Sequence, residues 1–185
     1  MFIQTEETPN PATLKFIPGR AVLPGDPRDF RTPGDAEVSP LAARIFAVDG
    51  VNGVFLGHDF ITVTKGRAEW QHIKPAVLGA IMEHYMSGAP VLAEARGART
   101  ADEEDFADED SGTVSVIKEL IETRVRPAVA NDGGDITFQG FRDGVVYLHM
   151  RGACSGCPSS TATLKQGIEN LLRHFVPEVM EVRPV

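Results

Sequence analysis

Four short segments in the first half of the chain have the hydrophobic spacing of strands. In each, apolar residues alternate with polar ones or form a short run bounded by turn-forming residues. The segments are residues 2–6, 13–16, 51–56 and 60–65. We expect the first two to be joined by a turn at residues 9–11, and the last two to form a hairpin around residues 57–59.

Two helices are predicted among these strands. Ser39 followed by Pro40 is typical of an N-cap with proline at the first helical position, and predicts a short helix through Ala47. A set of apolar residues at helical spacing predicts a longer amphipathic helix through Tyr85. Its members are Trp70, Ile73, Val77 and Ile81. Because it shares this face, the only tryptophan is expected in the core. Residues 18–35, rich in Pro, Gly and Asp, are expected to form a loop.

The last third of the chain predicts a helix, a hairpin and a second helix. The first helix has one apolar stripe, which consists of Val114, Ile117, Ile121 and Val125. Pro127 is expected to end this helix. Ile136 and Phe138 alternate with polar residues in one strand, and a tight turn at residues 142–144 leads to a returning strand. One face of that strand carries Val146, Leu148 and Met150. Apolar residues from 164 to 175 predict the second helix, and residues 178–182 a last short strand.

An acidic segment separates these two sets of elements. Seven of the 26 acidic residues lie at positions 101–110, where there is no basic residue, whereas the rest of the chain has 18 basic and 19 acidic residues. Like charges at this density repel one another and resist packing. We therefore predict a first domain at residues 1–86, an acidic flexible linker at 87–112 and a second domain at 113–185. Each domain is expected to be a small α+β unit with helices packed on an antiparallel sheet.

Composition excludes several classes of function. No apolar run approaches the roughly 20 residues of a membrane span, and the first residues lack the pattern of a secretory signal. We therefore expect a cytoplasmic protein with no membrane partner. No basic patch stands out in a chain of net charge −8, which argues against a nucleic-acid partner. No Ser/His/Asp set, paired-carboxylate signature or phosphate-binding loop indicates an enzyme.

The two cysteines of the chain, Cys154 and Cys157, carry its clearest chemistry. They lie between a predicted strand and a predicted helix, with Pro158 at the expected first helical position. Gly152 and Gly156 allow backbone conformations that a loop around an inorganic group needs. We expect the unpaired N–H groups and the dipole of the helix start to favour thiolate over thiol.

A thiolate pair at this spacing fits three kinds of site. In the first, two copies of the chain pool four thiolates around one 4Fe–4S cluster, and in the second the same thiolates hold a structural zinc ion. In the third, the pair cycles between dithiol and disulfide. The second domain is short and poor in strands for a thioredoxin-like fold, which weakens the third. The spacing alone does not separate the three sites.

Two neighbouring features were weighed as additional ligands. The segment NDGGD at residues 131–135 lacks the repeated acids and closing Glu of a calcium loop, so we interpret it as a helix-to-strand turn. The sequence leaves open whether this turn lies beside the cysteine loop. His149 is expected on the strand face opposite Leu148 and Met150, and therefore at a surface or interface.

Several motifs together closely resemble the C-terminal domain of the NifU family. They are RP at 126–127, NDGGD at 131–135, GVVYL at 144–148, GACSGCPSST at 152–161 and LKQGIE at 164–169. The first domain resembles the N-terminal domain of the Nfu branch. The matching stretches are FIQTE at 2–6, PNP at 9–11, V at 51, VF at 54–55 and DFITVTK at 59–65. The resemblance covers nearly the whole chain except the linker.

This resemblance implies an iron–sulfur cluster scaffold or carrier rather than an enzyme. In the family, the cysteines that match Cys154 and Cys157 ligate a 4Fe–4S cluster that bridges two subunits and is passed to apo-proteins. The implied partners are apo iron–sulfur client proteins, an upstream cluster-assembly scaffold and a second copy of the chain. We expect a cluster held near solvent by two thiolates per chain to be released readily. The expected location is the bacterial cytoplasm, with the mitochondrial matrix as the alternative for a mature protein.

Overall fold

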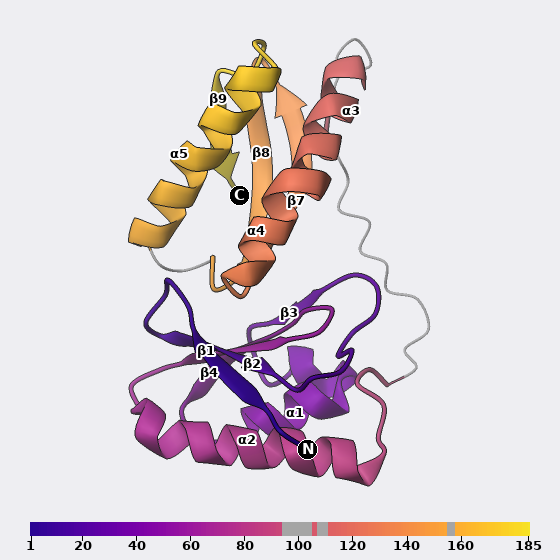
Figure 1. The fold of residues 1–185 in the computed structure, drawn as a ribbon, viewed down its shortest axis with the longest axis vertical. Helices are drawn as coiled ribbons and strands as arrows, with labels where there is room; N and C mark the ends of the chain where they lie inside the picture. Colours follow the sequence, from indigo (N-terminus) through magenta and orange to yellow (C-terminus); the bar gives the residue numbers. More distant parts are fainter. Residues whose placement is uncertain (94–104, 107–110, 155–157) are drawn as a thin grey trace. The chain divides into compact units, whose positions relative to one another are not determined.

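The computed structural model describes residues 1–93, 105–106, 111–154 and 158–185, with the backbone alone at 105–106 and 158–160 (Figure 1). Backbone contacts divide the chain into two compact units, unit 1 (Met1–Arg99) and unit 2 (Thr100–Val185). Each unit has its own sheet and helices, so the predicted α+β fold class is confirmed. Most of the acidic run lies outside the described residues, and the boundaries of the domains and linker stay predictions.

The sheet of unit 1 has the strand order β1-β2-β5-β4-β3, and every neighbouring pair is antiparallel. The strands are β1 (Gln4–Glu7), β2 (Thr13–Ile17), β3 (Arg28–Phe30), β4 (Val51–Leu56) and β5 (Ile61–Lys65). The predicted pairs β1–β2 and β4–β5 are confirmed. Strand β3 lies in the segment expected to be a loop, because three residues are too few to show alternation.

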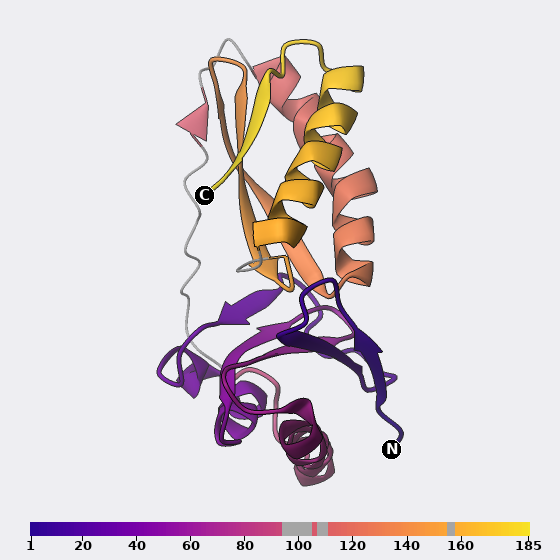
Figure 2. The same cartoon turned by 90° about the vertical axis from the view of Figure 1, so that its left-hand side faces the viewer.

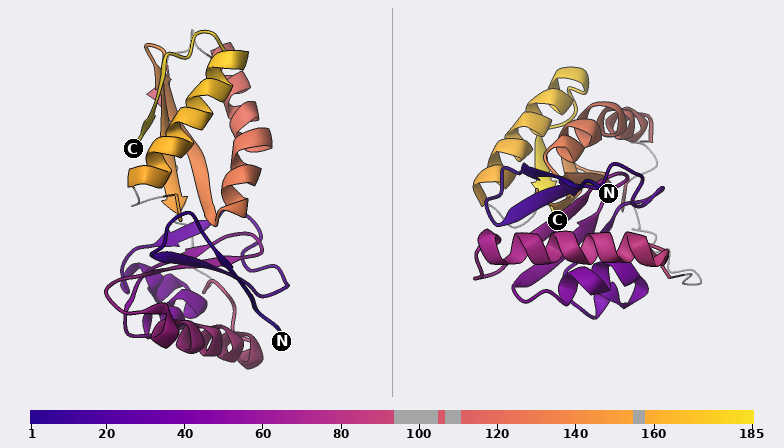
Figure 3. Two further views of the ribbon diagram at one scale, coloured as in Figure 1. Left: turned by 60° about the vertical axis from the view of Figure 1, so that its left-hand side comes forward. Right: turned by 60° about the horizontal axis from the view of Figure 1, so that its bottom comes forward.

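The helices of unit 1, α1 (Pro40–Phe46) and α2 (Trp70–Ser87), pack side by side (Figure 3). Apolar side chains from both helices and from the inner face of the sheet form one buried cluster. Trp70 packs against this cluster but is only half-buried, and its Nε1–H donates to the Pro11 carbonyl oxygen at 3.2 Å. The tryptophan thus ties the start of α2 to the turn between β1 and β2.

The start of α1 is the predicted N-cap. The Ser39 hydroxyl oxygen accepts a hydrogen bond from the Ala42 N–H at 3.1 Å, and a short 3-10 helix, η1 (Asp35–Val38), precedes it. Ser39 also donates to the Val91 carbonyl oxygen, and the Ala93 N–H donates to the Val38 carbonyl oxygen at 2.9 Å. The chain that leaves α2 therefore returns to α1 and lies against unit 1.

The sheet of unit 2 has the order β6-β7-β8-β9. Its strands are β6 (Asp105–Phe106), β7 (Gly134–Arg142), β8 (Val145–Gly152) and β9 (Glu181–Pro184). Strands β7 and β8 form the predicted antiparallel hairpin, with Asp143 (φ 51°) and Gly144 (φ 78°) in left-handed conformations at its turn. The outer strands β6 and β9 run parallel to their neighbours, whereas the sequence pattern predicts an antiparallel sheet.

A continuous helical segment and α5 (Pro158–Phe175) cover one face of this sheet (Figures 1 and 2). The segment consists of α3 (Ser111–Leu120), a π-helical turn η3 (Ile121–Val125) and α4 (Arg126–Asn131). The prediction that Pro127 ends the first helix is wrong. Pro127 is the second residue of α4, and the wider π-helical turn before it accommodates a residue without an N–H.

Candidate functional site

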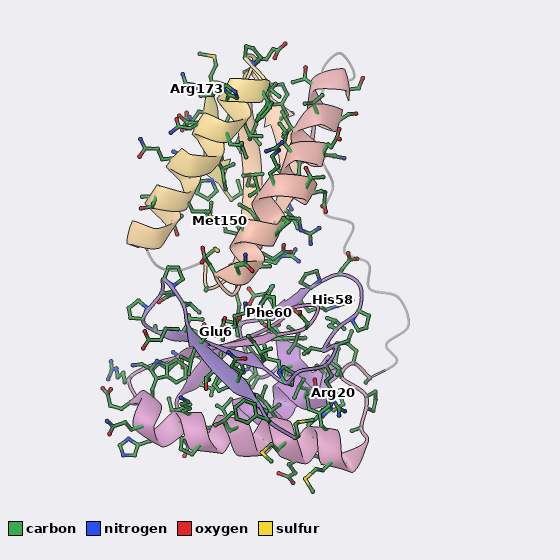
Figure 4. All side chains as sticks on the ribbon, viewed as in Figure 1. Glu6, Arg20, His58, Phe60, Met150 and Arg173 are labelled. Atoms are coloured by element: carbon green, nitrogen blue, oxygen red, sulfur yellow. The ribbon has the colours of Figure 1, made fainter. Side chains whose placement is uncertain are left out.

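Cys154 follows the last residue of β8 by two positions, and α5 begins at Pro158. The predicted helix start at this proline is therefore confirmed. Cys157 lies outside the described residues, so the structure places one of the two candidate ligands. Figure 4 labels Met150, near the end of β8 that leads into this loop. Cys154 therefore lies at one end of the sheet of unit 2, directly after β8.

Cys154 is buried, with 6% of its surface exposed, and belongs to the apolar cluster of unit 2. The Thr161 hydroxyl in the first turns of α5 donates to the Cys154 carbonyl oxygen at 3.1 Å. This bond joins the start of the cysteine loop to the helix that follows it. Cys154 is therefore packed into the interior of unit 2.

The turn between α4 and β7 lies directly against the cysteine loop. Gly133 has a left-handed conformation (φ 79°), and its carbonyl oxygen accepts a hydrogen bond from the Ala153 N–H at 3.2 Å. Gly134 pairs with Gly152 in the β7–β8 ladder. A β-carbon on Gly134 would lie 2.6 Å from the Cys154 sulfur. The NDGGD segment is thus the predicted helix-to-strand turn, and it forms one wall of the site.

An ion pair between half-buried Arg126 and buried Asp135 fixes this turn to the helix before it. The guanidinium of Arg126 donates to both carboxylate oxygens of Asp135, from Nε at 2.9 Å and from the terminal nitrogen at 3.1 Å. Asp135 is 4% exposed. Arg126 also donates to Glu122 at 2.7 Å. Burial opposes the charge on Arg126, but its hydrogen bonds and attraction to Asp135 and Glu122 outweigh this effect and raise its pKa.

The surroundings of Cys154 disfavour a thiolate. Burial is the largest cause, and the negative charges of Asp132 and Asp135 act in the same direction, so that together they raise the pKa of the thiol to about 12. The expectation that the start of α5 favours thiolate is therefore wrong for this residue. Because only a thiolate is a good ligand, binding of a metal here must displace a proton.

The described part of the chain offers no complete metal site. Among those residues, no three side chains of the His, Cys, Asp and Glu types are grouped to hold an ion. His149 is half-buried and alternates with the buried residues Leu148 and Met150, so it lies on the opposite face of the sheet, as predicted.

The sequence pattern did not indicate the roles of Arg126, Asp135 and Gly134. Arg126 and Asp135 are nine residues apart on two different elements, so no single periodicity connects them. The available signal was the shared proximity of the RP and NDGGD motifs to the cysteine block within one resemblance. That resemblance does not show that the turn at NDGGD touches Cys154, because this contact depends on the register of β7 with β8.

Two family descriptions match the chain. Residues 3–88 match the family described as scaffold protein Nfu/NifU N terminal, and residues 117–183 match the NifU-like domain. None of the helices in the described ranges is both long enough and apolar enough to cross a membrane.

Curated relatives match over the whole chain. A human protein named NFU1 iron-sulfur cluster scaffold homolog, mitochondrial, is 49% identical over 187 residues, which cover 100% of this chain and 72% of that protein. Proteins of the same name from Drosophila sechellia and Drosophila willistoni are each 52% identical over 100% of this chain. The chain spans 65% and 64% of the lengths of these two fly proteins.

Solved structures match about half of the chain. A NifU-like protein from Saccharomyces cerevisiae is 27% identical with a TM-score of 0.46, over 51% of this chain and 87% of that one. A Staphylococcus aureus protein is 29% identical with a TM-score of 0.39, over 43% of this chain and 98% of that one.

Proposed function

Because this chain belongs to the Nfu branch of the NifU family of iron–sulfur cluster scaffold proteins, we propose that Cys154 and Cys157 of two chains bind one 4Fe–4S cluster and pass it to apo-proteins. The cluster is cargo rather than a resident cofactor. The chain acts as a carrier and not as an enzyme.

The presence of two cysteines in the chain is the observation that carries the proposal. A 4Fe–4S cluster takes about four thiolate ligands, and the chain has two cysteines. The described residues add no group of side chains that would complete the set. Two chains related by two-fold symmetry supply four thiolates, as two equivalent pairs.

Transfer follows from ligand exchange at this shared site. A client thiolate replaces Cys154 or Cys157 on an iron atom, and the proton that the client thiol loses is available to the leaving cysteine. No electron is transferred in this exchange. Burial raises the pKa of free Cys154 and so favours its neutral thiol. This favours release of the cluster, because the cysteine is a thiol again after transfer.

The environment of Cys154 argues against a dithiol–disulfide oxidoreductase. A nucleophilic cysteine of such an enzyme is usually accessible and has a lowered pKa. Cys154 is buried, and its pKa is raised to about 12. The structural-zinc site uses the same four thiolates as the cluster, and metal analysis distinguishes the two.

The proposed partners are apo iron–sulfur client proteins, an upstream scaffold that supplies the cluster and a second copy of this chain. The names of the relatives, which include the word mitochondrial, fit the mitochondrial matrix as the place of work. No finding supports the bacterial cytoplasm.

The test is the content of iron, zinc and acid-labile sulfide per chain after anaerobic purification, together with the mass in solution. A shared cluster predicts about two iron and about two sulfide per chain in a dimer. About half a zinc per chain without sulfide would instead identify the zinc site.

Matched variants assign the ligands. Cys154→Ala and Cys157→Ser are each expected to abolish cluster retention, and His149→Ala is expected to retain the cluster, because His149 lies on the other face of the sheet. Retention of the cluster by both cysteine variants contradicts the assignment.

A further inference from the structure

The ion pair between Arg126 and Asp135 is more than a surface contact. Asp135 is 4% exposed and accepts two hydrogen bonds from one guanidinium, at 2.9 Å and 3.1 Å. This forked geometry fixes the direction of the carboxylate as well as its distance. Glu122, one helical turn before Arg126, accepts a third hydrogen bond at 2.7 Å and orients the guanidinium from the other side.

Stability alone is a weak reason for such a pair. The desolvation cost of placing a charge such as Asp135 in the interior commonly cancels much of the attraction to its partner, and apolar residues of similar volume often stabilise as well or better. The pair also sits directly after the π-helical turn η3, which shifts the direction of every later side chain on the helix. The forked contact with Asp135 and the π-helical turn before Arg126 together fix the position of the Arg126 guanidinium.

Asp135, which holds the Arg126 guanidinium, is linked to Cys154 by the chain, by a strand pair and by a hydrogen bond. Asp135 follows Gly134 in the chain, and Gly134 is paired with Gly152 across the ladder. The Ala153 N–H donates to the carbonyl oxygen of Gly133 at 3.2 Å. The Cys154 sulfur lies 2.6 Å from the position that a β-carbon on Gly134 would take. A shift of the turn at residues 132–134 therefore moves the surface on which the thiol rests.

We infer that Arg126 is a positioning residue for the ligand Cys154. Its guanidinium, held between Glu122 and Asp135, anchors the turn at residues 132–134, and this turn sets the place of the sulfur. The inference rests on the proposed function, because it takes Cys154 to be a cluster ligand. Arg126 is not a ligand in this inference and acts through the turn, by its contacts with Asp135 and Glu122.

The positive charge of Arg126 also favours binding of the cluster at Cys154. A cluster bound by four thiolates would be anionic, and Asp135 directly follows Gly134, whose β-carbon position lies 2.6 Å from the Cys154 sulfur. Arg126 offsets the charge of Asp135 through two hydrogen bonds. Removal of the guanidinium takes two hydrogen bonds from the buried carboxylate of Asp135.

The experiment compares Arg126→Lys and Arg126→Gln in the full chain. Lysine keeps the charge but cannot make the forked contact, so it separates geometry from charge. The control is Arg173→Gln, which removes an ion pair with Glu169 at 3.3 Å. Figure 4 shows Arg173 and Met150 at opposite ends of unit 2, so the control lies far from the cysteine loop.

Two measurements are made on each variant. The first is amide hydrogen exchange of Ala153 in the metal-free protein, with Val146 and Leu148 in the centre of the sheet as internal references. The second is the half-life of the reconstituted cluster against an iron chelator. Both Arg126 variants are expected to speed exchange at Ala153 but not at the references, and to shorten the half-life roughly 10- to 100-fold. Arg173→Gln is expected to change neither.

Two results overturn the inference. In one, Ala153 exchange and cluster half-life in both Arg126 variants match the unmodified chain. In the other, Ala153 and the references lose protection together in Arg126→Lys as well as in Arg126→Gln, which identifies a general structural role. If the unmodified chain binds no cluster, the proposed function fails, and the exchange measurement still decides whether Arg126 holds the turn.

Discussion

Gly134 and Cys154 are packed so closely that a β-carbon on the glycine would lie 2.6 Å from the cysteine sulfur. It would also lie 2.8 Å from the Arg151 carbonyl oxygen, which belongs to the backbone of β8 and cannot rotate away. Gly134 is thus needed because there is no room for a side chain. Gly133, in the same turn, is needed because its backbone is left-handed.

Replacement of Gly134 by alanine is expected to destabilise unit 2 and to weaken cluster retention. The added methyl group must displace either the thiol or β8, and overpacking of this kind costs about 1–3 kcal/mol. The free energy of unfolding is measured by denaturant titration with NMR amide signals of unit 2. Gly167→Ala on α5 is the control, because nothing lies within 4 Å of its β-carbon position. That substitution should stabilise the helix by about 0.5–1 kcal/mol. Equal stability of the two variants would contradict the close contact at Gly134.

The burial of Cys154 also predicts a difference between two conservative substitutions. Cys154→Ser places a hydroxyl in the apolar cluster of unit 2, and a buried hydroxyl without a partner costs about 1–3 kcal/mol. Cys154→Ala leaves a small cavity but no polar group. We expect the serine variant to unfold at lower denaturant than the alanine variant in the metal-free protein. The opposite order would mean that this side chain is hydrated in solution.

Local periodicity was sufficient for most of the fold. Val146, Leu148 and Met150 are buried as their alternation predicts, and the helices that begin at Pro40 and Pro158 start where proline indicates. These features depend on neighbours within a few positions along the chain. The local rule failed at Pro127, because the π-helical turn before it lets the helix continue to Asn131.

The candidate ligands can be found in the sequence, whereas the surroundings of Cys154 cannot. The spacing of Cys154 and Cys157 is visible in the sequence, whereas the burial of Cys154 depends on a glycine 20 positions earlier and on the register of two strands. The same is true of the contact between Arg126 and Asp135, which the helix and the strand make only after they pack. The helix-dipole argument predicted a thiolate because it took account of α5 and not of burial or of Asp132 and Asp135.

His84 predicts a pH dependence of unit 1. The side chain is fully buried on α2, neither ring nitrogen has a hydrogen-bond partner among the described residues, and its ring contacts that of Tyr85. Burial, and then the positive charge of Arg44, lower its pKa below the ordinary value of 6.5. The unfolded chain therefore binds a proton at a higher pH than the folded chain. Stability is fully present above about pH 6.5 and is lost as the pH falls toward the lowered pKa.

The measurement for His84 uses Trp70, the only tryptophan, as a reporter of unit 1. Denaturant titrations followed by its fluorescence give the free energy of unfolding between about pH 7 and pH 5. His84→Leu is expected to reduce the loss of stability over this range, because it removes the proton that the unfolded chain gains. His72→Leu, at an exposed position of the same helix, is the control and should leave the loss unchanged. An unaltered pH slope in His84→Leu would show that other groups cause it.

Ser39 joins two parts of unit 1 through one hydroxyl, and its removal is expected to cost more than an ordinary N-cap. The oxygen accepts from the Ala42 N–H, and the hydroxyl donates to the Val91 carbonyl oxygen beyond α2. Loss of the cap costs about 1 kcal/mol, and loss of the second bond at a buried site adds about 1 kcal/mol. Ser39→Ala should lower the stability reported by Trp70 fluorescence by this sum, whereas Ser87→Ala, at an exposed serine, should change it by less than about 0.5 kcal/mol. A loss no larger than that of the cap alone would mean that the segment after α2 leaves α1 in solution.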